Sequence, residues 1–236
     1  MESVAPGNAV SLEASPFFLL DGQRQSKCRV DSGADIEYEQ VICRIDRGHT
    51  RPGKRLNRLN VVVPCSPVPD VMFTEFHEYL MTGRTRDQFI ARGITGIDFV
   101  PTKAVSKRTR ERLTVWEAIV LGWGGQAAPE SGARLQEECP ACHHRHYSSI
   151  RDPEKLIQLD QWDGSDVFMI WPLPAFMFVT ERVVDLIIEN SITGVTWRKT
   201  LPPSAGCGYS PGGLGLWMPE ERARAIGDPI GIFSYR

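Results

Sequence analysis

The stretch from residue 166 to 200, DVFMIWPLPAFMFVTERVVDLIIENSITGVTWRKT, constrains the fold of this chain more than any other. Its first apolar run, up to Trp171-Pro172, is typical of a buried strand, and the run that follows has the period of a short amphipathic helix. Asn190 is a turn-former that ends this helix, and residues Ile192 to Arg198 then predict a second strand. The stretch contains no evident catalytic group. It therefore predicts a structural core, and a protein that acts by binding.

A short internal echo links this stretch to the first half of the chain. The sequences ITGIDF, at Ile94–Phe99, and ITGVTW, at Ile192–Trp197, lie 98 residues apart. Each follows a short amphipathic helix that ends in a turn-former, Gly93 or Asn190. A glycine at the start of a strand permits close packing or a bulge. The echo predicts a duplicated helix–turn–strand unit and hence two similar halves, with coincidence as the alternative for so short a match.

Short helices interspersed with strands predict an α+β fold, in which short helices pack on mixed or antiparallel sheets. With 236 residues, the chain can form one large domain or two small ones. We divide it into two α+β halves, residues 1–112 and residues 113–236. One continuous domain is the alternative.

Individual elements follow from the spacing of apolar residues. A helix is expected after Asp70, its N-cap, with Met72, Phe73, Phe76 and Leu80 on one face and Gly83 as its end. A second helix is expected from Thr85 to Arg92. A strand is expected at residues 95–100. The polar and basic segment 103–112 is expected to be a surface connection, and a last strand is expected at Ile230–Tyr235.

The net charge and its distribution along the chain limit the kinds of partner that the protein can bind. The net charge of −2 argues against a general binder of nucleic acids or membranes. Residues 1–112 hold 17 basic and 14 acidic side chains, whereas residues 113–236 hold 10 and 15. The second half can therefore present an acidic face to a basic partner. The basic loop 44–58 lacks interleaved aromatic residues, so a solvated loop is favoured over a phosphate-binding one.

The chain shows no signal-peptide pattern and no run of the roughly 20 apolar residues that span a bilayer. We therefore expect a cytoplasmic protein without membrane partners. In that reducing compartment, cysteines are expected to be thiols or metal ligands. This expectation covers all six: Cys28, Cys43, Cys65, Cys139, Cys142 and Cys207.

The most specific chemical feature is the turn Cys139-Pro140-Ala141-Cys142. Its spacing places two sulfurs on one side of a tight loop, as in a zinc knuckle. Tetrahedral zinc needs two more ligands, which His144 and His146 could supply locally, or Cys28, Cys43 or Cys65 from the first half. A relic of a metal site with free thiols is the alternative. A redox role is weaker, because the sequence after Cys142 does not continue as an amphipathic helix.

Carboxylates gather around one tryptophan in the second half. Asp160, Asp163 and Asp166 flank Trp162, and Asp152 and Glu154 precede them. An exposed tryptophan ringed by carboxylates can anchor a basic protein surface, so Asp160, Trp162, Asp163 and Asp166 are the candidate partner-binding residues. A solvated loop and acid–base chemistry are the alternatives.

Residues 139–201 resemble the C-terminal half of the double-CXXCG motif immunity proteins of myxobacteria and related bacteria. They are also similar to a broader group of bacterial polymorphic-toxin immunity proteins. The matching residues are the CPAC turn, Thr180-Glu181-Arg182 and Gly194-Val195-Thr196-Trp197. His143 stands where the family motif has glycine, and the first CXXCG has no intact copy. The resemblance implies a cytoplasmic protein that binds and neutralises one cognate toxin domain.

Three functions follow from these observations. The leading one is an immunity protein that occludes a cognate secreted bacterial toxin domain and has no enzymatic activity, with zinc as its candidate cofactor. The sequence holds no G-x-S-x-G, HExxH or P-loop motif. The alternative is a zinc-ribbon regulatory or nucleic-acid-binding protein, which needs a basic, aromatic face, whereas Glu137, Glu138 and Asp152 flank the turn. The third is an enzyme with a reactive Cys207 that reverses a toxin's modification.

Overall fold

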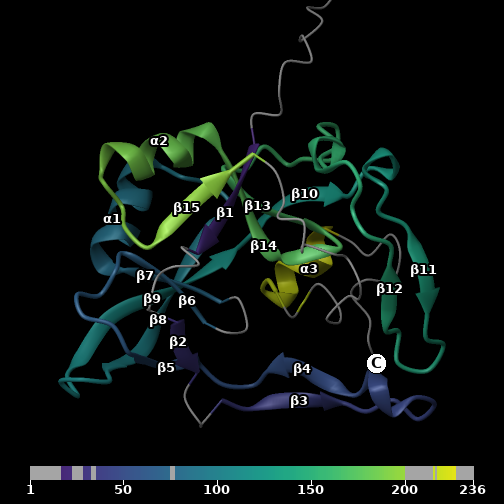
Figure 1. Ribbon diagram of the computed structural model, residues 1–236, viewed down its shortest axis with the longest axis horizontal. Helices are drawn as coiled ribbons and strands as arrows, with labels where there is room; N and C mark the ends of the chain where they lie inside the picture. The colour runs from purple at the N-terminus through teal and green to yellow at the C-terminus, as the bar shows by residue number, and fades with distance from the viewer. Residues whose placement is uncertain are drawn as a thin grey trace, which may run out of the picture.

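The computed structural model describes residues 17–22, 29–32, 36–74, 78–199, 215 and 217–226. This part of the chain forms an α+β fold in which short helices accompany mixed sheets, so the predicted fold class is confirmed. The described strands form a five-stranded sheet, a closed barrel of six strands and two hairpins. Figure 1 shows the sheet in the upper half, the barrel at the lower left and one hairpin along the lower edge. None of the described helices is long and apolar enough to cross a membrane.

The strands fall into four groups. The five-stranded sheet has the order β10 (Gly122–Gln126), β13 (Val167–Trp171), β14 (Leu173–Thr180), β1 (Phe17–Gly22) and β15 (Val195–Arg198). The barrel runs through β2 (Arg29–Ser32), β5 (Asn60–Val63), β8 (Ile97–Ser106), β9 (Arg112–Val120), β7 (Tyr79–Thr82) and β6 (Val71–Thr74). Two hairpins are separate from both: β3 (Tyr38–Val41) with β4 (Arg51–Arg55), and β11 (Leu135–Glu138) with β12 (Arg145–Tyr147). The α-helices are α1 (Gly83–Arg92), α2 (Glu181–Glu189) and α3 (Glu220–Ile226).

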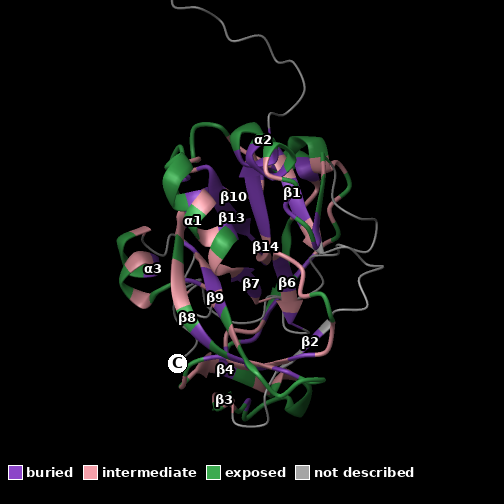
Figure 2. Cartoon of the chain, turned by 90° about the vertical axis from the view of Figure 1, so that its left-hand side faces the viewer, coloured by how far each residue is buried: buried purple, intermediate pink, exposed green. Residues whose placement is uncertain are grey.

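The main core lies between the five-stranded sheet and the outer wall of the barrel. All five residues of β13 are buried, among them Trp171 at 1% exposure. Figure 2 shows this sheet as the buried centre, with α1 and α2 exposed on their outer faces. A second, smaller core fills the barrel and includes Val61 and Leu80. Because β7 separates the two cores, Tyr79 and Met81 face the main core while Leu80 faces the barrel interior.

This two-sided burial explains one wrong prediction. The residues from Asp70 to Leu80, expected as a helix, instead include β6 and part of β7, which pair antiparallel. A strand that is buried on both faces is apolar at nearly every position, so its pattern does not distinguish it from a buried helix. The helix expected at Thr85–Arg92 is confirmed within α1. The expected last strand, Ile230–Tyr235, lies outside the described residues.

The segment 103–112, expected as a surface connection, is also different. Strand β8 continues through Pro101 to Ser106 and pairs with β9 along its whole length, and only the turn between them is a connection. Exposed Lys103 stands between buried Thr102 and buried Ala104, and Ser106 is buried as well. Because only one face of the hairpin is buried there, its composition is as polar as that of a loop.

The predicted helix–turn–strand unit occurs twice. In each copy a β-hairpin leads into a helix, the helix ends at a left-handed residue, and a Thr-Gly pair precedes the next strand. The left-handed residues are Gly93, with φ 65°, and Ser191, with φ 49°. A Cβ at Gly96 would lie 2.0 Å from the Val167 carbonyl oxygen, and one at Gly194 would lie 2.1 Å from that of Val71. Each Thr-Gly therefore packs against a strand of the other copy, which is why glycine is required.

Each copy also has a further strand inserted between two of its own strands. Strand β9 lies between β7 and β8, and β1 lies between β14 and β15 in the same antiparallel sense. The registers correspond, since Val115 pairs with Thr82 and Phe17 pairs with Thr180. Strand β1, from the start of the described chain, thus completes the sheet that contains β13, β14 and β15. The two halves of the chain therefore interlock.

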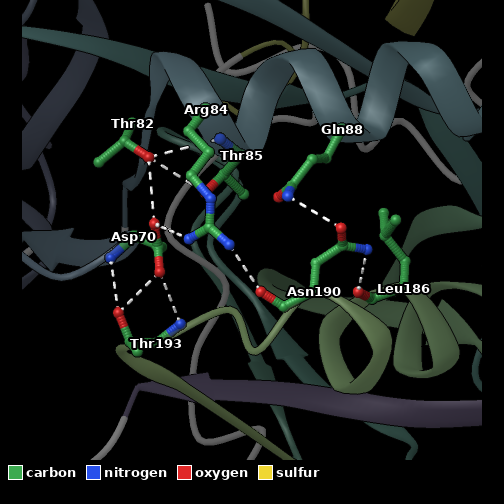
Figure 3. Close-up of polar contacts among 8 residues, drawn as sticks. All are labelled: Asp70, Thr82, Arg84, Thr85, Gln88, Leu186, Asn190 and Thr193. Atoms are coloured by element: carbon green, nitrogen blue, oxygen red, sulfur yellow. Dashed lines mark hydrogen bonds and ion pairs between the residues drawn. The ribbon is translucent and has the colours of Figure 1, made fainter.

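Two aspartates join the copies through matching hydrogen bonds. Asp70 Oδ2 accepts from the Thr193 backbone N–H at 3.0 Å and from its hydroxyl at 2.8 Å (Figure 3). Asp166 Oδ2 accepts from the same two groups of Thr95, each at 3.0 Å. An arginine at the start of each helix completes the arrangement. Arg84 donates to Asp70 Oδ1 at 3.1 Å, and Arg182 donates to Asp166 Oδ2 at 2.8 Å.

The same arginines also hold the opposite helix. Arg84 Nη2 donates to the carbonyl of Asn190, where α2 ends, at 2.7 Å (Figure 3), and Arg182 Nη2 donates to the carbonyl of Arg92, where α1 ends, at 2.5 Å. Cations at helix C-termini satisfy free carbonyls and complement the helix dipole. We call these two sets of contacts the Asp70 clamp and the Asp166 clamp.

Candidate metal centre

Four metal-ligating side chains meet where two hairpins approach each other. The ligand atoms of Cys43, His49, Cys139 and Cys142 all lie within 4.8 Å of one another. The first two come from the turn of the β3–β4 hairpin, here called the arm, and the other two from the turn between β11 and β12. Figure 1 shows the end of the arm directly below the β11–β12 hairpin. Two ligands from each of two hairpins is the arrangement of a zinc ribbon, and three cysteines with one histidine is a structural zinc set.

The arm turn is shaped by one aspartate. Asp46 is the N-cap of a short 3-10 turn, Arg47–His49, and its Oδ1 accepts from the Gly48 backbone N–H at 2.7 Å. The Asp46 backbone N–H lies 3.3 Å from Cys43 Sγ and donates to it. The tight turn that follows brings His49 back beside Cys43.

The CPAC turn is closed by its own backbone. The Cys139 N–H donates to the His144 carbonyl at 2.8 Å, and the His143 N–H donates to the Cys139 carbonyl at 3.0 Å. His143 has φ 53°, in the left-handed region that favours glycine. Its ring Nδ1 lies 2.9 Å from Glu138 Oε1, and buried Arg145 donates to Glu138 Oε2 at 3.1 Å. The glycine of the CXXCG motif thus corresponds to a position whose backbone is left-handed. His143 adopts this conformation here, and its side chain contacts Glu138.

The geometry of the sulfurs fits a tetrahedral metal ion. Cys43 Sγ and Cys139 Sγ lie 3.7 Å apart. Two thiolates on tetrahedral zinc, each about 2.3 Å from the ion, are separated by about 3.8 Å. The three cysteines are buried and form a small cluster of their own, with Val41 and Ala141 packed against it.

The histidine supplies an independent test of the fit. His49 Nδ1 is buried and has no hydrogen-bond partner among the described residues. Its other ring nitrogen, Nε2, lies 3.5 Å from Asp46 Oδ2. A carboxylate beside one ring nitrogen orients the imidazole and leaves the other nitrogen free to ligate a metal. A buried ring nitrogen without a hydrogen-bond partner, on a histidine whose ligand atom lies within 4.8 Å of three sulfurs, is an atom that a metal ion could satisfy.

The surroundings of the sulfurs favour thiolates at two of the three positions. The Asp46 N–H holds the pKa of Cys43 below its ordinary value, although burial opposes this. The backbone N–H groups of Ala141 and Cys142 lower the pKa of Cys139. Burial raises the pKa of Cys142, but Arg51 donates to its carbonyl at 3.1 Å and places a cation 3.7 Å from its sulfur. Because zinc binds thiolates, such preorganised anions aid its capture.

Two of the four predicted metal ligands belong to the group of Cys43, His49, Cys139 and Cys142, and two do not. Cys139 and Cys142 belong to the group, and Cys43 was one of the alternatives from the first half. His144 instead stacks on His49, with ring centroids 4.3 Å apart, and burial lowers its pKa. His146 is exposed on β12. The ligand that sequence reasoning missed is His49, whose only signal is its position six residues after Cys43 across an Asp-capped turn.

The other cysteines do not extend this group. Cys65 is disulfide-bonded, so the expectation that every cysteine is a thiol or a metal ligand is wrong at this position. Cys28 and Cys207 lie outside the described residues. The candidate centre thus rests on the three free cysteines that the structure describes and on His49.

The carboxylates around Trp162 serve the fold more than the surface. Trp162 is half-buried, packs edge-on against Phe17 at 5.0 Å, and donates its indole N–H to the Ser165 carbonyl. Asp163 Oδ2 accepts from the Trp123 N–H at 2.9 Å and from Arg222 at 2.6 Å. Asp166, 7% exposed, is occupied by its clamp. Of the four predicted partner-binding residues, Asp160 and Asp163 are exposed. Trp162 is therefore less exposed than expected, and a partner-binding role for these four residues stays a prediction.

Comparisons with known proteins add no name to this site. No model of a known protein family matches the chain, and no curated protein matches it either. The resemblance to the double-CXXCG immunity proteins therefore stays a prediction. What the described residues establish is a Cys₃His group that could hold a metal ion such as zinc.

Proposed function

We propose that this chain is a zinc-binding protein without catalytic activity that neutralises a cognate bacterial toxin domain by occlusion in the cytoplasm. The observation that carries the zinc part is the Cys₃His group of Cys43, His49, Cys139 and Cys142. Four protein ligands complete a tetrahedron and leave no position for water or substrate, so the ion would be structural.

The role of such an ion follows from where its ligands lie. Cys43 and Cys139 are 96 residues apart in the chain. Beyond the ligands, Arg51 donates across this junction to the sulfur and the carbonyl of Cys142. A bound ion would therefore fix the arm against the β11–β12 hairpin and give a rigid surface, as a stoichiometric inhibitor requires.

The immunity role is supported by the resemblance of residues 139–201, including the CPAC turn and Thr180-Glu181-Arg182. Thr180 and Arg182 both bind Asp166, so this part of the motif has a structural task here. Occlusion needs a stable scaffold and a fixed surface, and the interlocked halves with a metal-held arm offer both.

The zinc part is tested by metal analysis of the purified full chain. We expect about one equivalent of zinc in the natural protein and a loss in Cys139→Ser. His49→Ala should weaken zinc retention, whereas His144→Ala and His146→Ala should retain it. Less than about 0.2 equivalents at neutral pH in the natural protein would reject the site.

The immunity part is tested by co-expression with the secreted toxin domain encoded beside this gene. We expect growth to be restored and a stoichiometric complex to be isolated. Growth arrest that persists despite soluble expression of both proteins would reject the function.

A zinc-ribbon protein that binds nucleic acid is the second candidate, and one observation favours it. The fold brings the arm, with exposed Arg44 and Arg47, next to the CPAC turn. Neighbouring Arg51 contacts Cys142. Fluorescence anisotropy with labelled duplex and single-stranded oligonucleotides decides between the two candidates. Micromolar binding that weakens steeply with salt would favour the nucleic-acid function.

A further inference from the structure

We propose that the turn of the arm, residues 42–47, is the surface that contacts the partner, and that the partner offers an apolar pocket rimmed by carboxylates. This inference rests on the proposed function and names the binding surface that the function requires. Ile42 is 74% exposed and Ile45 is 65% exposed, more than any other large apolar side chain among the described residues. Single exposed apolar residues are common, but two within four positions at the tip of one hairpin are not explained by the fold.

The two isoleucines are presented by an anchored backbone. Cys43, which stands between them in sequence, is only 4% exposed and faces the metal group. The Asp46 N–H donates to its sulfur at 3.3 Å. Since the backbone at residues 43 and 46 is tied inward, the side chains of Ile42 and Ile45 project outward. A preorganised apolar tip loses little conformational entropy on binding, which favours high affinity.

The charge around the tip selects the partner. Arg44 and Arg47 are exposed, and neither has an ion pair with a described residue. The only acid in this turn is Asp46, whose carboxylate is engaged by the Gly48 N–H and lies beside His49. The tip is thus apolar with a cationic rim, and its complement is an apolar pocket with an anionic rim.

Two observations favour a protein partner of this kind over the alternatives. Residues 42–51 contain no tryptophan, tyrosine or phenylalanine, so stacking on nucleic-acid bases is not provided for. The acidic residues near Trp162 were expected to meet a basic partner, but Asp163 and Asp166 are bound within the fold. The partner is therefore expected to be acidic at the contact.

The experiment measures binding of the full-length, zinc-loaded protein to an inactive form of the adjacent-gene toxin domain, by calorimetry at physiological salt. We expect Ile42→Asp and Ile45→Asp each to weaken binding at least about 30-fold, as for a buried anchor. The double variant Arg44→Glu with Arg47→Glu should lower the association rate about tenfold and reduce its salt dependence.

Matched controls use residues of the same type and exposure elsewhere. Ile90→Asp, at a 61% exposed position on α1, and Arg112→Glu, on the β8–β9 hairpin, should bind like the natural protein. Zinc content and thermal unfolding are recorded for every variant. Because Ile42 and Ile45 are exposed, both quantities should be unchanged.

The outcomes separate this inference from the function on which it rests. If the natural protein does not bind the toxin domain, the proposed function fails and the surface fails with it. If the natural protein binds and the isoleucine variants bind equally well, the surface is wrong while the function stands. Tighter binding of the natural protein to an oligonucleotide duplex than to the toxin domain, lost in the arginine double variant, would overturn a protein partner for this surface.

Discussion

The centre of the molecule and its lower edge both join segments that are distant in sequence, but they do so by different physics. At the centre, the Asp70 clamp links residues 123 positions apart, and the Asp166 clamp links residues 71 apart, beside a large apolar core. At the edge, the arm meets the β11–β12 hairpin through a cluster whose buried members are three cysteines. The centre is thus stabilised by burial and hydrogen bonds, whereas the edge depends on a ligand. The centre should therefore be stable without a bound metal ion, whereas the edge should be ordered only when the ion is bound.

The two clamps themselves differ in burial. The Asp166 side chain is 9% exposed and that of Asp70 is 14% exposed. Asp166 Oδ1 also accepts from the Thr180 hydroxyl at 3.0 Å, whereas the equivalent Thr82 hydroxyl is 3.5 Å from Asp70. Hydrogen bonds are worth more where water is excluded, so the Asp166 clamp should contribute more.

The largest effect is expected when the Asp166 clamp is broken. Asp166→Ala leaves the Thr95 N–H without its acceptor and removes the partner of Arg182, so the free energy of unfolding should fall by about 3 kcal/mol. Arg182 is half-exposed, which keeps the loss below that of a fully buried pair. Urea denaturation followed by tryptophan fluorescence measures it. Asp160→Ala, at an exposed neighbour, is the control and should change stability by less than about 0.5 kcal/mol.

The equivalent change in the other copy should be milder and should depend on pH. Asp70→Asn should destabilise the protein by about 1–2 kcal/mol at pH 7. Partial burial opposes ionisation, but hydrogen bonds from Thr193 and the charge of Arg84 hold the pKa of Asp70 below its ordinary value. A lowered folded-state pKa contributes stability above the unfolded value, and this is lost as pH falls through the folded value.

The difference between Asp70→Asn and the natural protein should therefore shrink below about pH 4. Urea titrations between pH 7 and pH 3 provide the measurement. A difference that stays constant over this range would mean that ionised Asp70 contributes nothing to the clamp.

Helices α1 and α2 and the echo at Thr95-Gly96 and Thr193-Gly194 could be predicted from sequence, because helical periodicity and a repeated turn are local signals. The hairpin formed by β6 and β7 could not, because its burial on both faces is decided by two cores that only the tertiary structure creates. The pairing of β1 with β14 and β15 is likewise long-range, and no local pattern encodes it.

The candidate metal site shows the same division. The sequence spacing of Cys139 and Cys142 indicated half of the site, because a tight CxxC turn is local. His49 could not be chosen over His144 or His146 from spacing alone. The choice depends on the arm lying against the β11–β12 hairpin, where the His49 ring faces the sulfurs and His144 stacks behind it.

Removal of the metal should affect the edge and the centre of the molecule differently. After treatment with a strong chelator, amide protection in residues 139–145 and 43–49 should fall to that of an open loop, since the ligands no longer tie the two turns. Strands β13 and β14 should keep their protection, and the midpoint of the main unfolding transition should move by the equivalent of about 1 kcal/mol or less. Hydrogen exchange read by mass spectrometry resolves both regions. Loss of protection in β13 together with the turns would contradict an intrinsic centre.

The smallest effect tests the conformational demand of the CPAC turn. His143→Gly relieves a left-handed residue, which costs an ordinary side chain about 1–2 kcal/mol, but it also removes the exposed contact with Glu138. The net gain should be about 0.5–1 kcal/mol in metal affinity, or roughly two- to fivefold in chelator competition. His143→Ala is the matched control, because alanine loses the Glu138 contact and keeps the backbone penalty, so its affinity should fall below that of the natural protein. If glycine and alanine have the same effect, the turn does not require a left-handed residue at this position, and the glycine of the CXXCG motif needs another explanation.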